Sequence, residues 1–195
     1  KSVLEKLLWP ISFTLNLFRV LTIFIKLNPK KVLLMGGYIS SIGLIIGKML
    51  FKKLYVHEQN SILGTSNNFA RRFANKVFTS FKIGLNNEYN LGNPIRKEIH
   101  EACYFDDPVK NTILVIGGSQ GSKFFNENLP DILDNSEISE KIIFQKGNHS
   151  VNFLSRKIEF IDFIEDLPAT FTKTKFVICR AGASTIAELQ SYGMP

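Results

Sequence analysis

Two short polar segments of the 195-residue chain have the composition of ligand-binding loops. Residues 57–60 (His-Glu-Gln-Asn) follow the apolar run 53–56, and residues 117–121 (Gly-Gly-Ser-Gln-Gly) follow the apolar run 112–116. Ligand sites of α/β proteins form where a buried strand passes into a helix, because backbone N–H groups and the positive end of the helix dipole gather there. The sequence therefore predicts two ligand-binding loops about sixty residues apart.

The glycine-rich segment 117–121 suits a phosphate or a diphosphate. Its glycines let backbone N–H groups approach an anion, and Ser119 adds a hydroxyl donor beside Gln120. The spacing is neither that of a Walker loop nor that of the dinucleotide fingerprint Gly-x-Gly-x-x-Gly. A tight turn that binds nothing is the alternative interpretation.

The segment 57–60 allows three interpretations. His57 and Glu58 could work as an acid–base pair. The four side chains could equally position the hydroxyl groups of a sugar, or they could serve the structure alone. Arg96, which follows the turn at 92–94, could bind a phosphate or a sugar through its planar guanidinium.

A third loop, at 180–182 (Arg-Ala-Gly), joins an apolar run to a helical pattern that begins at Ala183. Its small residues permit close approach of a ligand. Glu188 lies early enough in the helix to bond a ribose diol, as acids do in other nucleotide-binding folds; a favourable charge near the helix start is the alternative. The candidate ligand contacts here are Ala183, Ser184, Thr185, Ile186, Ala187 and Glu188.

Strand and helix patterns alternate at short spacing, which predicts parallel sheets wrapped by helices. We expect strands at 31–35, 53–56, 76–79, 112–116, 141–145, 157–160 and 175–179, with a further short one in 81–90. We expect helices at 4–27, 40–50 (capped by Ser40 or Ser41), 63–74, 123–133, 166–172 and 183–191. The turn-rich segment 92–96 predicts a boundary between two domains, 1–94 and 95–195.

Composition bounds the class of protein. With 45% hydrophobic and 21% charged residues, the chain is globular and long enough for one large or two small domains. Cys103 and Cys179 have neither Cys-x-x-Cys spacing nor neighbouring histidines, so we expect no metal site. Two cysteines in this length favour a reducing compartment, and Cys179, in an apolar run, is expected to be buried.

All of the excess positive charge lies in the first third of the chain. The net charge is +7, yet residues 1–57 alone hold nine Lys or Arg residues and one acid. Such asymmetry indicates an anionic partner. Nucleic acid is not expected, because the segment lacks the interleaved aromatic and basic pattern of single-strand binders.

The predicted helix 4–27 is unusually apolar. Polar residues interrupt it too often for a transmembrane span, and no signal-peptide cleavage site follows. One apolar face would hold Leu4, Leu8, Ile11, Leu15, Phe18 and Ile25, and a second Trp9, Phe13, Leu17, Leu21 and Phe24. Packing on a domain requires only one such face, so the other could touch anionic lipid. Burial of both faces is the alternative.

Six blocks, taken in order, resemble the MurG family of bacterial peptidoglycan glycosyltransferases. They are 36–38 (Gly-Gly-Tyr), 57–60, 92–96, 117–121, 160–162 (Phe-Ile-Asp) and 179–188. The resemblance implies an α/β fold of the GT-B type, with two Rossmann-like domains that are both incomplete in this chain. It also implies an inverting transfer, without metal or cofactor, of N-acetylglucosamine from UDP-N-acetylglucosamine to lipid I, which forms lipid II in peptidoglycan synthesis.

The resemblance also assigns roles to residues. Asn60 and Arg96 would contact the donor sugar or phosphate, Ser119 would hold the diphosphate, and Gln120 would lie beside it. The backbone of Ile161 would read the uracil edge, the segment 183–188 would flank the sugar nucleotide, and Glu188 would bind the ribose. His57 and Glu58 would line the acceptor side.

The expected partners follow from the same resemblance. The acceptor would be linked to undecaprenyl diphosphate, and residues 1–31 would meet an anionic membrane surface, at the cytoplasmic face of the bacterial inner membrane. The family's first glycine-rich loop, with its proposed basic His, and its Gln-containing sugar loop are absent from the sequence. We therefore expect a fragment that is inactive alone. The alternatives are another UDP-sugar transferase or epimerase of this fold, and a non-catalytic membrane-docking subunit of a split transferase.

Overall fold

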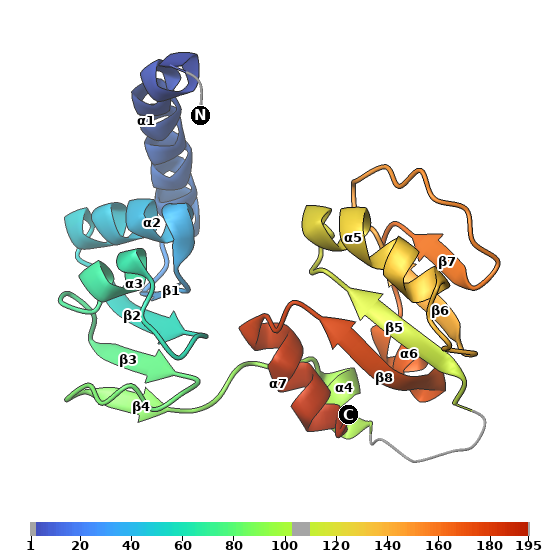
Figure 1. Ribbon diagram of the computed structural model, residues 1–195. Coiled ribbons are helices and arrows are strands. Elements are labelled where there is room, and N and C mark those ends of the chain that lie inside the picture. Colours follow the sequence, from blue (N-terminus) through green and yellow to red (C-terminus); the bar gives the residue numbers. More distant parts are fainter. Residues whose placement is uncertain (1–2, 103–109, 195) are drawn as a thin grey trace. The chain divides into compact units, whose positions relative to one another are not determined.

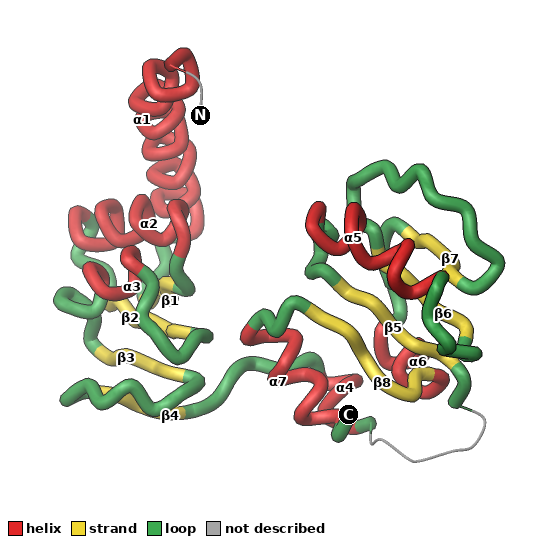
Figure 2. Tube along the Cα trace, in the orientation of Figure 1, coloured by secondary structure: helices red, strands yellow, loops and turns green. Residues whose placement is uncertain are grey.

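The computed structural model describes residues 3–102 and 110–194 (Figure 1). The chain divides into two compact units, Lys1–Asn93 (unit 1) and Pro94–Pro195 (unit 2). Each unit contains its own four-stranded sheet of parallel strands, visible as the two groups of yellow segments in Figure 2. The division lies one residue before the boundary proposed from the sequence.

Unit 1 has the strand order β1-β2-β3-β4. Its strands are β1 (Lys31–Leu34), β2 (Lys53–Glu58), β3 (Lys76–Thr79) and β4 (Glu88–Asn90), and its helices are α1 (Val3–Leu27), α2 (Gly37–Met49) and α3 (Thr65–Ala70). Leu44 of α2 and Ala70 of α3 pack on Leu54 and Val56 of β2. Gly47 lets α2 approach the sheet, because a Cβ there would lie 2.6 Å from a methyl group of Leu54.

Three sequence expectations in unit 1 were wrong at element ends. Strand β2 continues through His57 and Glu58, because β3 pairs with both residues. Helix α2 begins at Gly37 without a serine cap, since Gly36 has φ 87° and turns the chain directly from β1 into the helix. Helix α3 ends at Ala70 rather than 74, because the Asn75 N–H and side chain both return to the backbone of Leu54.

Helix α1 packs on α2 through one of its two apolar faces. Phe24 is buried against Ile42 and Ile46 of α2, with Phe13, Leu17 and Leu21 beside them. On the other face Leu15, Phe18 and Ile25 are exposed. Burial of both faces is therefore not what unit 1 shows. The side chains of Leu4, Leu8, Trp9 and Ile11 lie outside the described residues.

Across 3–102 and 110–194, no helix combines the length and the hydropathy that crossing a membrane would require.

Unit 2 has the strand order β7-β6-β5-β8. Its strands are β5 (Thr112–Ile116), β6 (Lys141–Gln145), β7 (Ile158–Ile161) and β8 (Thr174–Cys179), and its helices are α4 (Lys97–Glu101), α5 (Lys123–Asp134), α6 (Leu167–Lys173) and α7 (Ala183–Tyr192). All its predicted elements are present with ends within one residue, whereas α4 was not expected. Cys179 is half-buried rather than buried, and Cys103 lies outside the described residues.

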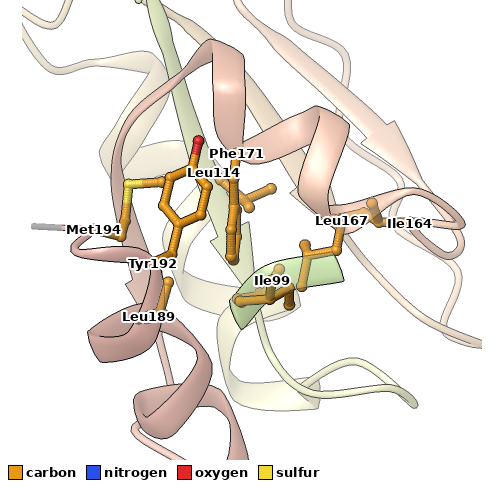
Figure 3. Close-up of a cluster of buried hydrophobic side chains, with 9 residues drawn as sticks. Ile99, Leu114, Ile164, Leu167, Phe171, Leu189, Tyr192 and Met194 are labelled. Carbon is orange, nitrogen blue, oxygen red and sulfur yellow. The ribbon is translucent and has the colours of Figure 1, made fainter. Parts of the chain in front are cut away.

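Both faces of the unit 2 sheet are covered. Leu114 and Ile116 of β5 face a cluster built by α4, α6 and α7, in which Phe171 and Tyr192 meet at ring centroids 5.1 Å apart (Figure 3). Ile113 and Val115 point to the other face and pack with Leu133 of α5. This double coverage explains why β5 is an unbroken apolar run.

The carboxylate of Glu88 organises the turn before β4. It accepts hydrogen bonds from the Thr79 hydroxyl (2.6 Å), and from the N–H groups of Ile83 (2.8 Å), Gly84 (2.8 Å) and Leu85 (3.0 Å). These donors, the Thr79 hydroxyl foremost, lower the pKa of Glu88 from 4.5 to about 2.

Glu88→Gln should remove an acid-dependent part of the stability of unit 1. Because the folded state holds the carboxylate ionised, the contribution of Glu88 is present above pH 4.5 and is lost as the pH falls toward 2. The free energy of unfolding, measured by urea denaturation between pH 7 and pH 2, should therefore differ most between the two proteins at pH 7. A difference that does not shrink in acid would contradict this account of the turn.

Candidate functional site

A cavity of about 220 Å³ opens at the carboxyl ends of the strands of unit 2. Its lining residues are of two kinds, and we call the polar ones the polar wall and the apolar ones the apolar wall. The lining residues are Arg96, Ile116, Gly118, Ser119, Gln145, Phe163, Ile164, Leu167, Phe171, Thr185 and Glu188. The carboxyl edge of a parallel sheet is where α/β proteins bind ligands.

The glycine loop 117–121 forms part of the polar wall through Gly118 and Ser119. Helix α5 begins just behind it, and the hydroxyl of Ser122 caps this helix by accepting from the N–H of Phe125 (3.4 Å). The loop thus gathers N–H groups and a helix N-terminus, as the sequence predicts for an anion site. Gln120 is not among the lining residues; its carbonyl packs on Gly147.

Gly121 and Gly147 allow two loops to touch backbone to backbone. A Cβ on Gly121, whose φ is 78°, would lie 2.1 Å from the carbonyl oxygen of Lys146. A Cβ on Gly147 would lie 2.0 Å from the carbonyl oxygen of Gln120. No side chain fits at either position, so the two glycines fix the glycine loop against the segment that follows β6.

Gly121→Ala should destabilise the chain by about 2–4 kcal/mol, because the new methyl group meets backbone atoms that cannot move aside. Gly118→Ala is the matched control, since Gly118 also has a positive φ (96°) but has nothing within 4 Å of the added Cβ. It should cost only the backbone strain, about 1–2 kcal/mol. Equal free energies of unfolding for the two variants would show that the loop contact is not tight.

Arg96 and Glu188 form a two-pronged ion pair in the polar wall. Arg96 precedes α4, and Glu188 lies in α7. The guanidinium Nε and Nη2 donate to the two carboxylate oxygens, each at 2.7 Å. The hydrogen bond with Glu188 raises the pKa of Arg96. The sequence proposed separate phosphate and ribose contacts for these residues; in this structure they bind each other.

The remaining predicted residues of α7 differ in position. Thr185 lines the cavity beside Glu188, whereas Ala183, Ser184, Ile186 and Ala187 are not among the lining residues. Just before the helix, Ala181 has φ 52°, a left-handed conformation that few non-glycine residues adopt. Such strain at a strand-to-helix turn is typical of ligand-binding loops.

The segment after β7 supplies Phe163 and Ile164 to the apolar wall. The Ile161 carbonyl, in the backbone predicted to read a base, accepts from the N–H of Lys146 (2.9 Å), and Ile161 is not among the lining residues. Phe163 lines the cavity while 57% exposed, and sequence reasoning missed it. The available signal was an aromatic residue directly after the block 160–162.

In unit 1 the predicted pair His57 and Glu58 is not a pair. Neighbouring residues of a strand point to opposite faces. His57 Nε2 lies 3.1 Å from the carbonyl oxygen of Gly92, and Nδ1 lies 3.2 Å from the amide nitrogen of Gln59.

Glu58 instead holds the loop that follows β2. It is 2% exposed, and its Oε1 accepts from the N–H and the side-chain amide of Asn60 (3.1 and 3.0 Å). Its Oε2 accepts from Gly64 N–H (2.9 Å) and the Asn67 amide (3.0 Å). Burial raises the pKa of Glu58, but the Gly64, Asn67 and Asn60 donors outweigh it, so the pKa is lowered. The acid–base interpretation therefore gives way to a structural one, and Asn67 is the partner that sequence reasoning missed.

No three His, Cys, Asp or Glu side chains come together as a metal site within the described parts of the chain.

Residues 1–79 match the sequence model of the glycosyltransferase family 28 N-terminal domain, and residues 112–195 match that of the glycosyltransferase family 28 C-terminal domain. The chain belongs to glycosyltransferase family 28. The first match lies within unit 1 and the second within unit 2.

Curated family 28 relatives bear the name UDP-N-acetylglucosamine--N-acetylmuramyl-(pentapeptide) pyrophosphoryl-undecaprenol N-acetylglucosamine transferase. One from Polynucleobacter asymbioticus is 32% identical over an alignment of 208 positions that covers 100% of this chain and 58% of the relative. One from Baumannia cicadellinicola is 34% identical over an alignment of 210 positions that covers 98% of this chain and 58% of the relative. The chain thus spans less than two thirds of the length of these relatives, and its predicted resemblance to MurG is confirmed.

Solved structures agree with a GT-B fold. MurG of Acinetobacter baumannii superimposes with a TM-score of 0.62 at 26% identity, covering 94% of this chain and 56% of that one. MnaA of S. aureus, solved with UDP, superimposes with a TM-score of 0.67 at 13% identity, covering 94% and 60%. The second likeness shows the fold alone. The predicted α/β class with two Rossmann-like units is confirmed.

Proposed function

We propose that this family 28 chain binds UDP-N-acetylglucosamine in the cavity of unit 2. In the whole enzyme it would transfer N-acetylglucosamine to an acceptor linked to undecaprenyl diphosphate, as the names of its relatives describe. The observation that carries the proposal is the cavity itself, whose lining combines the glycine loop, Arg96 and Glu188 with apolar residues that include Phe163.

The polar wall suits a diphosphate leaving group. In an inverting transfer the acceptor oxygen forms a bond to the anomeric carbon while the bond from that carbon to the diphosphate oxygen breaks, and its electron pair leaves with UDP. The N–H groups of the glycine loop, the Ser119 hydroxyl and the Arg96 guanidinium would stabilise this charge without a metal ion. Glu58 is unsuited to accept the hydroxyl proton, because it is 2% exposed and both of its oxygens already accept hydrogen bonds from the loop that follows β2.

The nucleoside would contact the other lining residues of the cavity. Glu188 would exchange its guanidinium partner for the ribose diol, which frees Arg96 for the phosphates. Phe163 would offer a face on which the base can stack, a contact worth about 1–3 kcal/mol in other nucleotide sites. The two charged residues that pair in this structure would then each hold a different part of the donor.

Isothermal titration calorimetry of the full chain with UDP-N-acetylglucosamine, UDP and GDP tests this proposal. We expect both uridine nucleotides to bind and GDP to bind at least about tenfold more weakly, because the names of the relatives specify a UDP-linked donor. A folded chain that binds none of the three would overturn the donor assignment.

The exposed face of α1 suggests how the enzyme would reach a lipid-linked acceptor. Leu15, Phe18 and Ile25 project from it, and Arg19 and Lys26 are exposed on the same helix. An amphipathic helix with this composition binds anionic interfaces. A UDP-sugar epimerase or a transferase with a water-soluble acceptor would not need such a face.

Replacing both Phe18 and Ile25 by serine should weaken binding to vesicles that contain anionic phosphatidylglycerol by about tenfold or more, because apolar area is lost from the interface. Both side chains are exposed, so the fold should be preserved. Leu154→Ser, at a fully exposed apolar residue of unit 2, is the control and should bind like the wild type. Unchanged co-sedimentation of the double variant with vesicles would exclude α1 as the contact.

A further inference from the structure

Gln145 is a buried polar residue that follows three apolar residues at the end of β6. It is 6% exposed and ends β6, which lies between β5 and β7. Its side chain lines the cavity, and its Nε2 donates to the carbonyl oxygen of Gly118 at 3.0 Å. Burying an amide here is unfavourable unless it is hydrogen-bonded, so the bond to the glycine loop accounts for a glutamine at this position.

The residue that follows Gln145, Lys146, is held in place by hydrogen bonds and an ion pair. Asn126 of α5 donates its side-chain amide to the Lys146 carbonyl (2.8 Å), and the Lys146 N–H donates to the Ile161 carbonyl (2.9 Å). Lys146 also forms an ion pair with Asp162. The backbone next to Gln145 is therefore fixed, and it joins the glycine loop to the end of β7.

The Gly118 carbonyl oxygen accepts two hydrogen bonds, one from Gln145 and one from the N–H of Gly121 within the loop (2.9 Å), and the two together set which way one peptide group faces. In a trans peptide the C=O of one residue and the N–H of the next point in opposite directions. Gly118 has φ 96°, and a glycine at such an angle can turn its peptide group over at little cost. Together with the Gly121 N–H, Gln145 holds the Gly118 carbonyl, which keeps the N–H of Ser119 on the opposite side and prevents the carbonyl oxygen from facing an anion.

We infer that Gln145 is a positioning residue for diphosphate recognition: it fixes the peptide between Gly118 and Ser119 so that the Ser119 N–H is available to the diphosphate. The inference rests on the proposed function of the cavity. It assigns to Gln145 an effect on the phosphates alone, because its bond reaches the glycine loop and not the walls proposed for the nucleoside.

The test compares UDP with uridine, by calorimetry on the full chain. Gln145→Ala should raise the Kd for UDP by about tenfold and leave the Kd for uridine within about twofold, which lowers the preference for the diphosphate. Gln145→Glu keeps the shape of the side chain but presents an ionised oxygen to the Gly118 carbonyl, and it should weaken UDP binding further. Ile143→Ala, a half-buried residue of the same strand, should lower stability and preserve the UDP-to-uridine ratio.

The possible outcomes are distinguishable. Equal weakening of UDP and uridine by Gln145→Ala, or a loss of preference in Ile143→Ala as well, would show that Gln145 only supports the fold and would overturn the inference. Unchanged binding of both ligands would overturn it too. A wild-type chain that binds neither UDP nor uridine would overturn the proposed function, and this inference with it.

Discussion

Glu188→Ala should weaken the binding of UDP-N-acetylglucosamine by about tenfold to hundredfold. A carboxylate that accepts hydrogen bonds from a diol contributes about 1.5–3 kcal/mol, and each 1.4 kcal/mol is a factor of ten. Because the free protein already pairs Glu188 with Arg96, the diol must replace a guanidinium, which keeps the effect below the sum of two charged hydrogen bonds. Calorimetry on the full chain gives the two dissociation constants.

Glu140→Ala is a closely matched control for this variant. Glu140 also belongs to unit 2 and forms an ion pair with Lys175 at 2.7 Å. The Glu140 side chain is 20% exposed, and that of Glu188 is 16% exposed. It is not among the cavity residues. The control should lose similar stability and keep its affinity for the donor. Equal loss of donor affinity in both variants would mean that Glu188 acts through the fold rather than on the ligand.

Arg96→Ala completes this argument, because the proposed exchange gives the two partners different ligands. The arginine variant should lose affinity for UDP but not for uridine, whereas the Glu188 variant should lose affinity for both. A double-mutant cycle then measures the coupling between the two side chains in the free and the bound protein. Identical ligand profiles for the two variants would contradict the exchange.

The sequence predicted unit 2 better than unit 1 for a physical reason. Strands buried on both faces appear as short unbroken apolar runs, so β5 and β6 could be located closely. The end of β2 could not be located, because polar residues such as histidine and glutamate usually follow a buried strand rather than belong to it. There the cost of burial is offset by donors from Asn67 and Gly64, residues whose proximity only the fold establishes.

The sequence identified several residues of the candidate site, but it did not show how they are arranged. Ser119, Thr185, Arg96 and Glu188 were all proposed from local patterns, yet the ion pair joins positions 92 residues apart. Gln145 was missed although it shares the pattern of His57, a polar residue at the end of an apolar run. This pattern does not predict a role until the hydrogen-bond partner of the polar side chain is known, which for Gln145 is the Gly118 carbonyl.

Glu58→Gln should cost about 3–5 kcal/mol of stability, a loss expected when one member of a buried, charged hydrogen-bond network is changed. The replacement amide keeps one acceptor oxygen but directs its NH2 group either at the donors of Asn60 or at those of Gly64 and Asn67, which then have no acceptor. Since the network lowers the pKa of Glu58, the wild type should lose this stabilisation on acidification, below the ordinary pKa of a glutamate, and the variant should not. Urea denaturation at neutral and acidic pH measures both effects.

Asn60→Ala separates the network from the catalytic interpretation of Glu58. It removes one side-chain donor and leaves the Asn60 backbone donor in place, so it should cost only about 1 kcal/mol. A stable Glu58→Gln variant would show that the four bonds do not hold the loop, and it would restore the acid–base role. A destabilised Glu58→Gln variant supports the view that Glu58 fixes the path of the chain from β2 to α3. In that case His57 is the ionisable side chain of the segment 57–60 that does not belong to this network.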